Sequence, residues 1–366
     1  MRRVTPRIVA LAAVVAASLS FPASAYDGGT RLCRFTDSRI GESSGVVVAS
    51  FDDHLVWTHN DSGDVARWFL VDTTTCATRA TYRLDTPETP SAGGENVTAL
   101  DWEDMARGVS ATGAPTLLFG DIGDNYQARS PVSVYEVLEP DGTLPAGVAP
   151  TDEQPVALVA RHDLVYPSGP RDAETLLFVA QTRQLAVVTK PRDAANGLGY
   201  TGKSEVYVAA PGLPATSGPV PLTKVADVDF TTMPRRDPTV PESYAASGGD
   251  VSHDGTRFVV RTYFEAYEWA VGADHDLGHA VAAGPPLRIP LLDTKQGEAI
   301  TYTNDDATLV TTTEGSGTDG NARGGAIDAY RTDAEPAPVV PEGFPVLLGL
   351  GGALVLGAVA RRRRTA

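Results

Sequence analysis

Short runs of apolar and β-branched residues recur between residues 27 and 333, and glycine, proline, aspartate or asparagine separates them. No long stretch of this region has the 3.6-residue periodicity of an amphipathic helix. Short apolar runs bounded by turn-forming residues are typical of β-strands. The pattern therefore predicts an all-β domain built from many short strands.

The runs form repeating units of four strands each. The first unit comprises residues 42–50, 55–58, 68–71 and 78–84, and the second comprises residues 101–109, 116–119, 132–137 and 156–164. The third comprises residues 173–179, 185–189, 205–208 and 222–228, and the fourth comprises residues 249–252, 258–263, 266–271 and 287–292. Repeats of four short strands are typical of β-propeller blades.

A fifth unit has only three runs, at residues 298–303, 308–313 and 327–331, and a spare run at residues 31–35 precedes the first unit. A strand from one terminus that completes the last blade removes the open edge of the ring. We therefore expect residues 27–333 to form a β-propeller of five four-stranded blades, closed by the N-terminal strand. Six or seven blades stay open as alternatives if adjacent units have been merged.

The charge of the chain limits its partners. The 366 residues carry a formal net charge of −16, and seven of the 30 lysine and arginine residues lie at the two ends. Such an acidic body repels nucleic acid and attracts divalent cations. We expect a monomer that binds no nucleic acid.

The first 25 residues predict export. Arg2, Arg3 and Arg7 precede an apolar run at residues 8–21, and Ala23-Ser24-Ala25 follows it. A basic start, a short apolar segment and small residues at the end are typical of a signal peptide, residues 1–25 here. The apolar run is too short for a membrane anchor.

The C-terminal residues predict an attachment to the membrane. A linker at residues 334–343 leads to an apolar segment at residues 344–360 and a basic tail at residues 361–366. Such a segment can cross a bilayer with its arginines on the cytoplasmic side. The end resembles bacterial surface-protein sorting signals at Val340-Pro341-Glu342, although Gly343 replaces their second proline. We expect a cell-surface protein, either anchored by this segment or released after processing.

Cys33 and Cys76 are the only two cysteines of the chain. In an exported protein an even number of cysteines favours a disulfide over a metal pair. The chain-entropy model gives a loop of this length about 4 kcal/mol as an upper figure. Because Cys33 lies in the closing strand, the bond would tie that strand to the first unit.

Each unit opens with an acidic residue beside small or polar ones. The five openings are Glu42-Ser43-Ser44-Gly45, Trp102-Glu103-Asp104, Asp172-Ala173-Glu174, Gly249-Asp250-Val251 and Gly297-Glu298-Ala299. The innermost strands of a propeller line its tunnel, so these acids would converge on one opening, the mouth of the tunnel. Oxygen ligands without cysteine or histidine favour Ca²⁺ over zinc.

Propeller connectivity brings the loops after the second strand of each unit to the same mouth. These loops contain residues 59–64, residues 121–129 including Asp121, Asp124 and Arg129, then Lys190, and residues 261–263 including Arg261. Carboxylates beside basic groups can move protons and offset developing charge. We therefore take Asp121, Asp124, Arg129 and Arg261 as the candidate catalytic residues.

Several short motifs resemble the secreted calcium-activated nucleotidases (apyrases), which are five-bladed propellers with calcium in the tunnel. The similar segments are Glu42-Ser43-Ser44-Gly45, Trp102-Glu103-Asp104-Met105-Ala106, Glu174, Asp250 and Gly297-Glu298-Ala299-Ile300. The resemblance implies a calcium site, whose ligands would be Ser43, Glu103, Glu174, Asp250 and Glu298. Asp250 stands where that family has a serine, and the nucleotide-binding loops have no counterpart here.

A broader likeness connects this chain to exported bacterial propellers that carry Asp-Trp-Glu-Asp and Gly-Asp-Ile-Gly-Asp-Asn. Here these motifs are residues 101–104 and 120–125. The likeness covers most of the domain and implies no established activity.

Two functions are consistent with these features. One is an exported, calcium-dependent hydrolase of phosphate or carboxylate esters, in which Asp121 or Asp124 activates water. The other is a non-catalytic surface module in which calcium stiffens a propeller that binds a glycan, a small molecule or a protein. The first predicts turnover that requires the metal, and the second predicts binding without turnover.

Overall fold

The computed structural model describes residues 26–85, 99–193, 199–237, 239–292, 296–315 and 325–332. The predicted signal peptide, linker, C-terminal apolar segment and basic tail all lie outside these residues, so their assignments stay predictions. In the described part of the chain, no helix has both the length and the apolar character that a membrane crossing requires.

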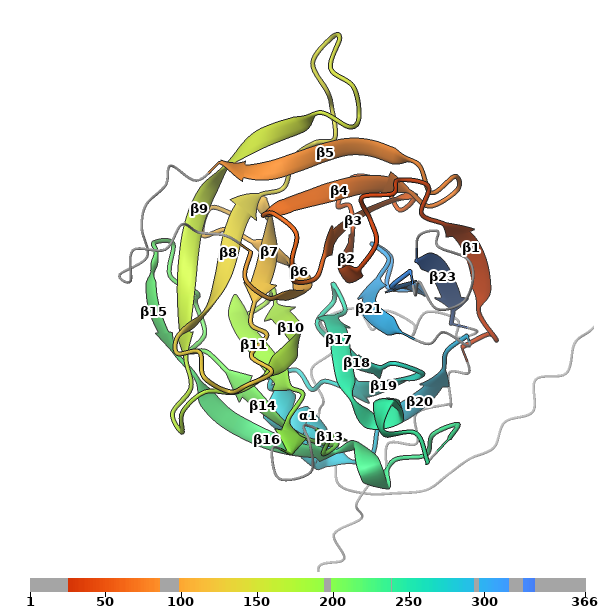
Figure 1. The fold of residues 1–366 in the computed structure, drawn as a ribbon. Helices are drawn as coiled ribbons and strands as arrows, with labels where there is room; N and C mark the ends of the chain where they lie inside the picture. Colours follow the sequence, from red (N-terminus) through yellow and green to blue (C-terminus); the bar gives the residue numbers. More distant parts are fainter. Residues whose placement is uncertain are drawn as a thin grey trace, which may run out of the picture. The chain divides into compact units, whose positions relative to one another are not determined.

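The described residues form an all-β fold with several four-stranded antiparallel groups (Figure 1), and the all-β prediction is confirmed. The first group contains β2 (Ser43–Val48), β3 (Leu55–Asn60), β4 (Arg67–Asp72) and β5 (Thr78–Asp85). The second contains β6 (Trp102–Val109), β7 (Pro115–Asp121), β8 (Val132–Leu138) and β9 (Glu153–Val165). β5 and β9 pair in parallel, so these two groups share one nine-stranded sheet, which also includes β15 (Gly218–Pro221).

The remaining groups are separate sheets. The third contains β10 (Ala173–Val179), β11 (Gln184–Thr189), β14 (Lys203–Val208) and β16 (Thr223–Asp229). The fourth contains β17 (Ala246–Val251), β18 (Arg257–Thr262), β19 (Glu265–Ala270) and β20 (Leu287–Pro290). The last contains β21 (Gly297–Tyr302), β22 (Thr308–Thr313), β23 (Ala326–Arg331) and the N-terminal β1 (Thr30–Arg34), which pairs antiparallel with β23.

The first strands of these groups make a closed ring of contacts. β2 contacts β6, β6 contacts β10, β10 contacts β17, β17 contacts β21, and β21 contacts β2 again. Figure 1 shows these strands near the centre, with the later strands of each group further out. The domain therefore has a β-propeller-like fold.

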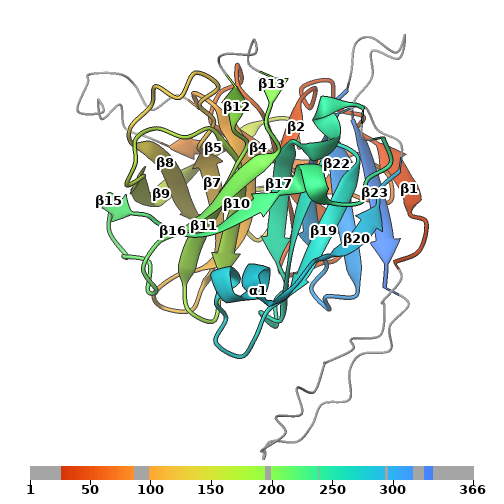
Figure 2. The ribbon, with the colours of Figure 1, turned by 90° about the horizontal axis from the view of Figure 1, so that it is seen from below.

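Shorter elements lie at the two ends of the strands. The hairpin of β12 (Arg192–Asp193) and β13 (Gly199–Tyr200) lies at one end, and α1 (Leu277–Ala283) lies at the other (Figure 2). Two 3₁₀ turns, η2 (Phe230–Thr232) and η3 (Pro241–Tyr244), follow the third group. The sequence pattern predicted none of these elements, because each is too short to show a period.

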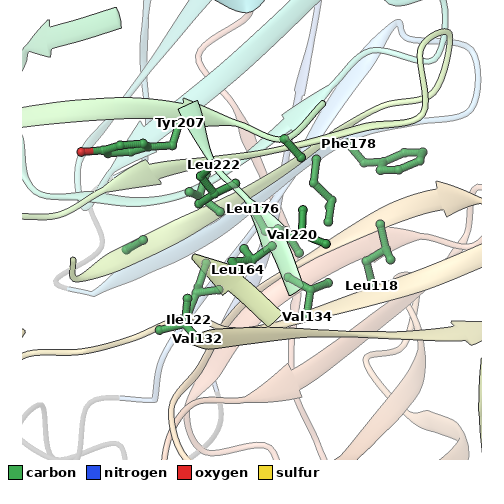
Figure 3. Close-up of a cluster of buried hydrophobic side chains, with 14 of the residues drawn as sticks. Leu118, Ile122, Val132, Val134, Leu164, Leu176, Phe178, Tyr207, Val220 and Leu222 are labelled. Carbon is green, nitrogen blue, oxygen red and sulfur yellow. The ribbon is translucent and has the colours of Figure 1, made fainter. Parts of the chain in front are cut away.

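The core consists of apolar layers between neighbouring groups. All residues of β10 are buried, and Leu176 and Phe178 pack against the second group while Leu177 and Val179 pack against the fourth. Figure 3 shows the layer between the second and third groups. Since alternate residues of a strand point to opposite faces, an inner strand covered on both faces reads as a continuous apolar run. This is why 173–179 could be predicted without error.

A disulfide joins Cys33 of β1 to Cys76 in the turn between β4 and β5, with the two Cα atoms 5.7 Å apart. The predicted pairing is confirmed. The bond links the last group to the first, where Phe35, Val46 and Ile327 form an apolar layer around it.

Replacing both cysteines with serine is expected to lower the free energy of unfolding by about 3 kcal/mol, because the closed loop no longer restricts the unfolded chain. Urea unfolding of the Cys33→Ser/Cys76→Ser variant measures the loss. Oxidised wild type treated with a reductant should fall to the stability of the variant. Equal stability of the variant and the oxidised wild type would contradict this role for the bond.

Candidate functional site

The mouth of the tunnel is formed by the starts of the inner strands and the loops after the second strands. Antiparallel pairing brings them together, since Ser43 of β2 lies opposite Asn60 of β3, and Trp102 of β6 lies opposite Asp121 of β7. Residues just before an inner strand therefore lie beside residues just after the second strand of the same group: the Asp61 amide donates to the Glu42 carbonyl, and the Gly123 amide donates to the Asp101 carbonyl.

Each inner strand has a register shift near its start, where one residue has no direct partner on the second strand. The shifts lie between Ser43 and Gly45, Trp102 and Asp104, Ala173 and Thr175, Ala246 and Gly248, and Gly297 and Ala299. The extra residue in each shift is then Ser44, Glu103, Glu174, Ser247 or Glu298. A bulge of this kind turns its side chain away from the regular alternation. The sequence-based alignment of the units instead set Ser43 and Asp250 at these positions.

Three carboxylates at the mouth meet as a candidate cation site. One carboxylate oxygen each from Asp61, Asp101 and Glu103 lies within 4.8 Å of the other two. Glu103 is only 4% exposed, and none of the described residues donates a hydrogen bond to its side chain. A buried carboxylate without a donor, directed at two other carboxylates, is a costly arrangement unless a cation or a proton is shared between them.

The pKa values of these three carboxylates are raised, as expected for a site in which negative charge is costly. Burial and the neighbouring Asp61 raise the pKa of Glu103 well above its usual range. Burial and Asp61 also raise the pKa of Asp101 to about 6, and burial raises the pKa of Asp61 itself. Several negatively charged carboxylates close together in a low-dielectric site repel one another, so the site favours either protonation or a bound cation. The oxygen-only donors suit Ca²⁺, whose coordination tolerates irregular geometry.

The loop after β7 holds Asp101 and Glu103 in place. A Cβ atom at Gly123 would lie 2.5 Å from Asp101 Oδ2 and would also collide with the Glu103 carboxylate. Any side chain larger than glycine at this position would therefore displace the carboxylates of Asp101 and Glu103. The Gly123 amide also donates to the Asp101 carbonyl at 3.2 Å.

The candidate catalytic residues Asp121, Asp124 and Arg129 lie together in this loop. Asp121 accepts hydrogen bonds from Arg129 Nη2 at 2.6 Å and from the Asp101 amide at 3.1 Å. Asp124 accepts from the amides of Ala128 and Arg129 at 2.9 and 2.7 Å. Each carboxylate thus already has donors that fix the shape of the loop. Their catalytic role stays a prediction.

Arg261, the fourth candidate, is only 1% exposed and donates to backbone carbonyls. Its guanidinium bonds Ala299 at 2.9 Å, Thr312 at 3.1 Å and Tyr263 at 3.2 Å. These bonds join the fourth group to the last. In this structure the side chain therefore connects two sheets, and its predicted catalytic role is untested.

Ser43 and Asp250, two of the predicted metal ligands, lie in hydrogen-bond networks away from the three carboxylates. The Ser43 hydroxyl lies 2.7 Å from Thr58 Oγ1 and 3.0 Å from Thr312 Oγ1. Asp250 accepts from Thr301 Oγ1 at 2.8 Å and from the Tyr302 amide at 2.9 Å. Of the five predicted ligands, only Glu103 belongs to the cluster of three carboxylates.

A buried lysine occupies the mouth beside the other two predicted ligands. Lys190 is 3% exposed, forms an ion pair with Glu174, and lies 5.2 and 5.5 Å from the ring centres of Tyr200 and Tyr263. An ammonium over aromatic faces and beside a carboxylate is stabilised by both. The propeller connectivity predicts Lys190 at the mouth, but no sequence pattern indicates its pairing with Glu174.

Glu298 is buried near this lysine and accepts no hydrogen bond from the described residues. Burial raises the pKa of Glu298 to about 8, while Lys190 acts in the opposite direction. Burial, Asp61 and Glu42 raise the pKa of nearby Glu314 to about 7. The mouth therefore contains acids that bind protons near neutral pH.

The metal-free protein is expected to become about 1 kcal/mol more stable as the pH falls from 8 to 7. The folded state takes up a proton at Glu298 in this interval, whereas a glutamate in the unfolded chain, with its ordinary pKa of 4.5, does not. Burial lowers the pKa of His59 to about 4, so His59 opposes the gain only below the unfolded histidine value of 6.5. Urea unfolding in EDTA at pH 8.0, 7.5 and 7.0 measures the change. Glu298→Gln should remove most of it, and a wild type that loses stability over this interval would contradict the prediction.

No protein-family model matches the sequence, and no curated protein matches it either. Among solved structures, the crystal structure of the RRP9 WD40 repeats has a TM-score of 0.41 and 10% identity, covering 85% of this chain and 99% of that chain. The structure of U3-55K has a TM-score of 0.38 and 10% identity, covering 82% of this chain and 98% of that chain. The chain is distantly similar in structure to WD40 β-propeller proteins.

Proposed function

We propose that this chain is an exported, calcium-binding β-propeller of five blades that binds an oxygen-rich small molecule or glycan at its mouth. The observation that carries the proposal is the carboxylate of Glu103, buried without a hydrogen-bond donor among the described residues and directed at Asp61 and Asp101. Asp61, Asp101 and Glu103 would hold the cation. This set replaces four of the five ligands expected from the sequence.

Calcium suits this set because carboxylate oxygens are its preferred ligands and because it takes six to eight of them. Three carboxylates leave positions for further oxygens, and a ligand rich in hydroxyl or carboxylate groups can supply them. The acidity of the rest of the mouth argues against binding of an anion without the cation.

Titration of calcium chloride into EDTA-treated, dialysed protein tests the proposal. We expect one equivalent of calcium per chain, and we expect Asp101→Asn to weaken binding at least tenfold. Asp52→Asn is the matched control, because Asp52 is exposed in the turn between β2 and β3 at the other end of the strands. The proposal would be overturned if calorimetry detected no calcium binding by wild type, or if Asp101→Asn bound calcium with the same affinity as wild type.

A second candidate function is cation-dependent hydrolysis of a phosphate or carboxylate ester at the same mouth. The observation that favours it is Lys190, a buried ammonium beside the carboxylates that can offset negative charge developing on a substrate. A bound calcium ion would polarise the ester oxygen. Glu298, which has no donor among the described residues, is the candidate proton acceptor above its raised pKa of about 8, since Asp121 and Asp124 already accept bonds within their loop.

Turnover measurements separate the two functions. Nucleotides, phytate, lactones and aryl esters are offered to wild type with calcium and with EDTA. Hydrolysis that requires calcium and falls in Lys190→Met and Glu298→Gln supports the enzyme. Calcium binding without turnover of any of these esters supports the binding module.

The proposed location is the cell surface. The signal-peptide pattern of residues 1–25, the apolar segment at residues 344–360 and the Cys33–Cys76 disulfide support it, because disulfides persist in oxidising compartments. Fractionation of cells that express the full chain tests it. Recovery of the protein in the cytosol with free thiols would contradict the proposal.

A further inference from the structure

A cavity of about 320 Å³ lies at the end of the inner strands opposite to the mouth. The turns that follow the inner strands converge here and line the cavity. They contribute Ser50, Gly113, Ala180, His253 and Asn304. The volume is at the lower end of the range for small-molecule sites, which is about 300–1,000 Å³. The cavity is therefore separate from the three carboxylates of the candidate cation site.

Arg107 supplies an unpaired positive charge to this cavity. Its guanidinium makes one hydrogen bond, from Nη1 to Asn304 Oδ1, and it forms no ion pair with any described residue. Arginine has five N–H donors, so most of them are available to a ligand. Burial lowers the pKa of Arg107, which is the expected effect on a guanidinium whose charge is incompletely compensated.

The charged side chains of the wall favour an anion over a cation. Asp250 is the only acid among the described residues that line it, and its carboxylate accepts bonds from Thr301 Oγ1 at 2.8 Å and from the amides of Tyr302 and Val251 at 2.9 and 2.8 Å. A metal cation would meet a guanidinium and an acid already occupied by donors. A ligand with a carboxylate instead meets the free N–H groups of Arg107, which match it in a bidentate geometry.

Two further features define the ligand. The wall also contains Val109, Pro115, Phe178 and Val251, so the body of the ligand is apolar. The carboxylates of Asp250, Glu139, Asp306 and Asp53 act on Arg107 from further away, and they would repel additional negative charge on a ligand. A single negative charge is therefore favoured over two.

We propose that this cavity is a binding site for small monocarboxylates with an apolar body, in which Arg107 pairs with the carboxylate. This site is independent of calcium and of the proposed function at the mouth.

Benzoate is the probe that tests the site on the intact protein. Saturation-transfer NMR and calorimetric titration in calcium-containing buffer should give saturable binding to wild type. Arg107→Gln should weaken it at least tenfold, and benzamide and inorganic phosphate should bind wild type at least tenfold more weakly than benzoate does. Arg79→Gln is the matched control, since Arg79 is 61% exposed and lies outside the cavity; it should bind benzoate as wild type does.

A second variant keeps the test decisive if Arg107→Gln does not fold. Ala180 is an exposed residue of the cavity wall. Ala180→Trp would fill the cavity and leave the Arg107 guanidinium in place. We expect this variant also to lose benzoate binding by at least tenfold. The proposal is overturned if wild type does not bind benzoate, if both variants bind it as wild type does, or if phosphate binds more tightly.

Discussion

Calcium is expected to raise the melting temperature of the metal-free protein by about 8 °C when its concentration is about a thousand times the dissociation constant. A ligand that binds only the folded state then contributes about 4 kcal/mol, and each kcal/mol corresponds to about 2 °C for a domain of this size. The physical reason is that the carboxylates of Asp61, Asp101 and Glu103 repel one another in a partly buried site until a cation lies between them. A melting series in EDTA and in increasing calcium measures the gain.

The Glu103→Gln variant distinguishes calcium binding at these carboxylates from a general effect of ionic strength on the melting temperature. The amide keeps the shape of the side chain and removes the buried charge, so the variant should melt at least as high as wild type in EDTA and gain little from calcium. Asp52→Asn should gain as much as wild type does. Wild type that melts at the same temperature in calcium and in EDTA would remove the cation site from the proposal.

Most strands could be predicted because the inner strands are buried on both faces. Leu177 packs toward one neighbouring sheet and Phe178 toward the other, so both positions must be apolar and the run is easy to read. The β12–β13 hairpin and β15 could not be predicted in this way. They are short segments of mixed polarity, and β15 pairs with β9 across a long stretch of sequence, so tertiary contacts decide their structure.

The positions of Glu103, Glu174 and Glu298 at the mouth could also be predicted, but the identity of their partners could not. The same prediction is wrong for Asp250, which lines the cavity at the opposite end of the inner strands. A shift of one residue at the start of a strand changes which face of the strand each side chain occupies, and the shift has no signature in the sequence. Ser44 and Ser247 hold the positions that correspond to Glu103, and both bond the neighbouring inner strand, Ser247 Oγ at 2.8 Å from the Gly297 carbonyl. Asp61 was visible only as one of several polar residues in a loop.

Asp104, which follows Glu103 in the same motif, has a structural role. Its carboxylate is completely buried and accepts hydrogen bonds from three backbone amides, those of Met105 at 2.9 Å, Leu176 at 2.9 Å and Gly249 at 3.1 Å. The three amides belong to β6, β10 and β17, which are the inner strands of three different groups. One side chain therefore joins three sheets at the axis of the domain, directly next to Glu103.

Asp104→Ala is accordingly expected to lower the free energy of unfolding by about 5 kcal/mol, since each of three buried amides loses its acceptor at a cost of about 1–3 kcal/mol. Urea unfolding in saturating calcium measures the loss. The control is Asp305→Ala: this exposed carboxylate also accepts two bonds, from Thr303 Oγ1 and the Ala307 amide, but both lie within its own turn. Its loss should stay below about 1 kcal/mol, because water can replace an exposed partner. Equal losses in the two variants would mean that Asp104 does not hold the inner strands together, and that the packing of the apolar layers alone fixes the geometry in which Glu103 meets Asp61 and Asp101.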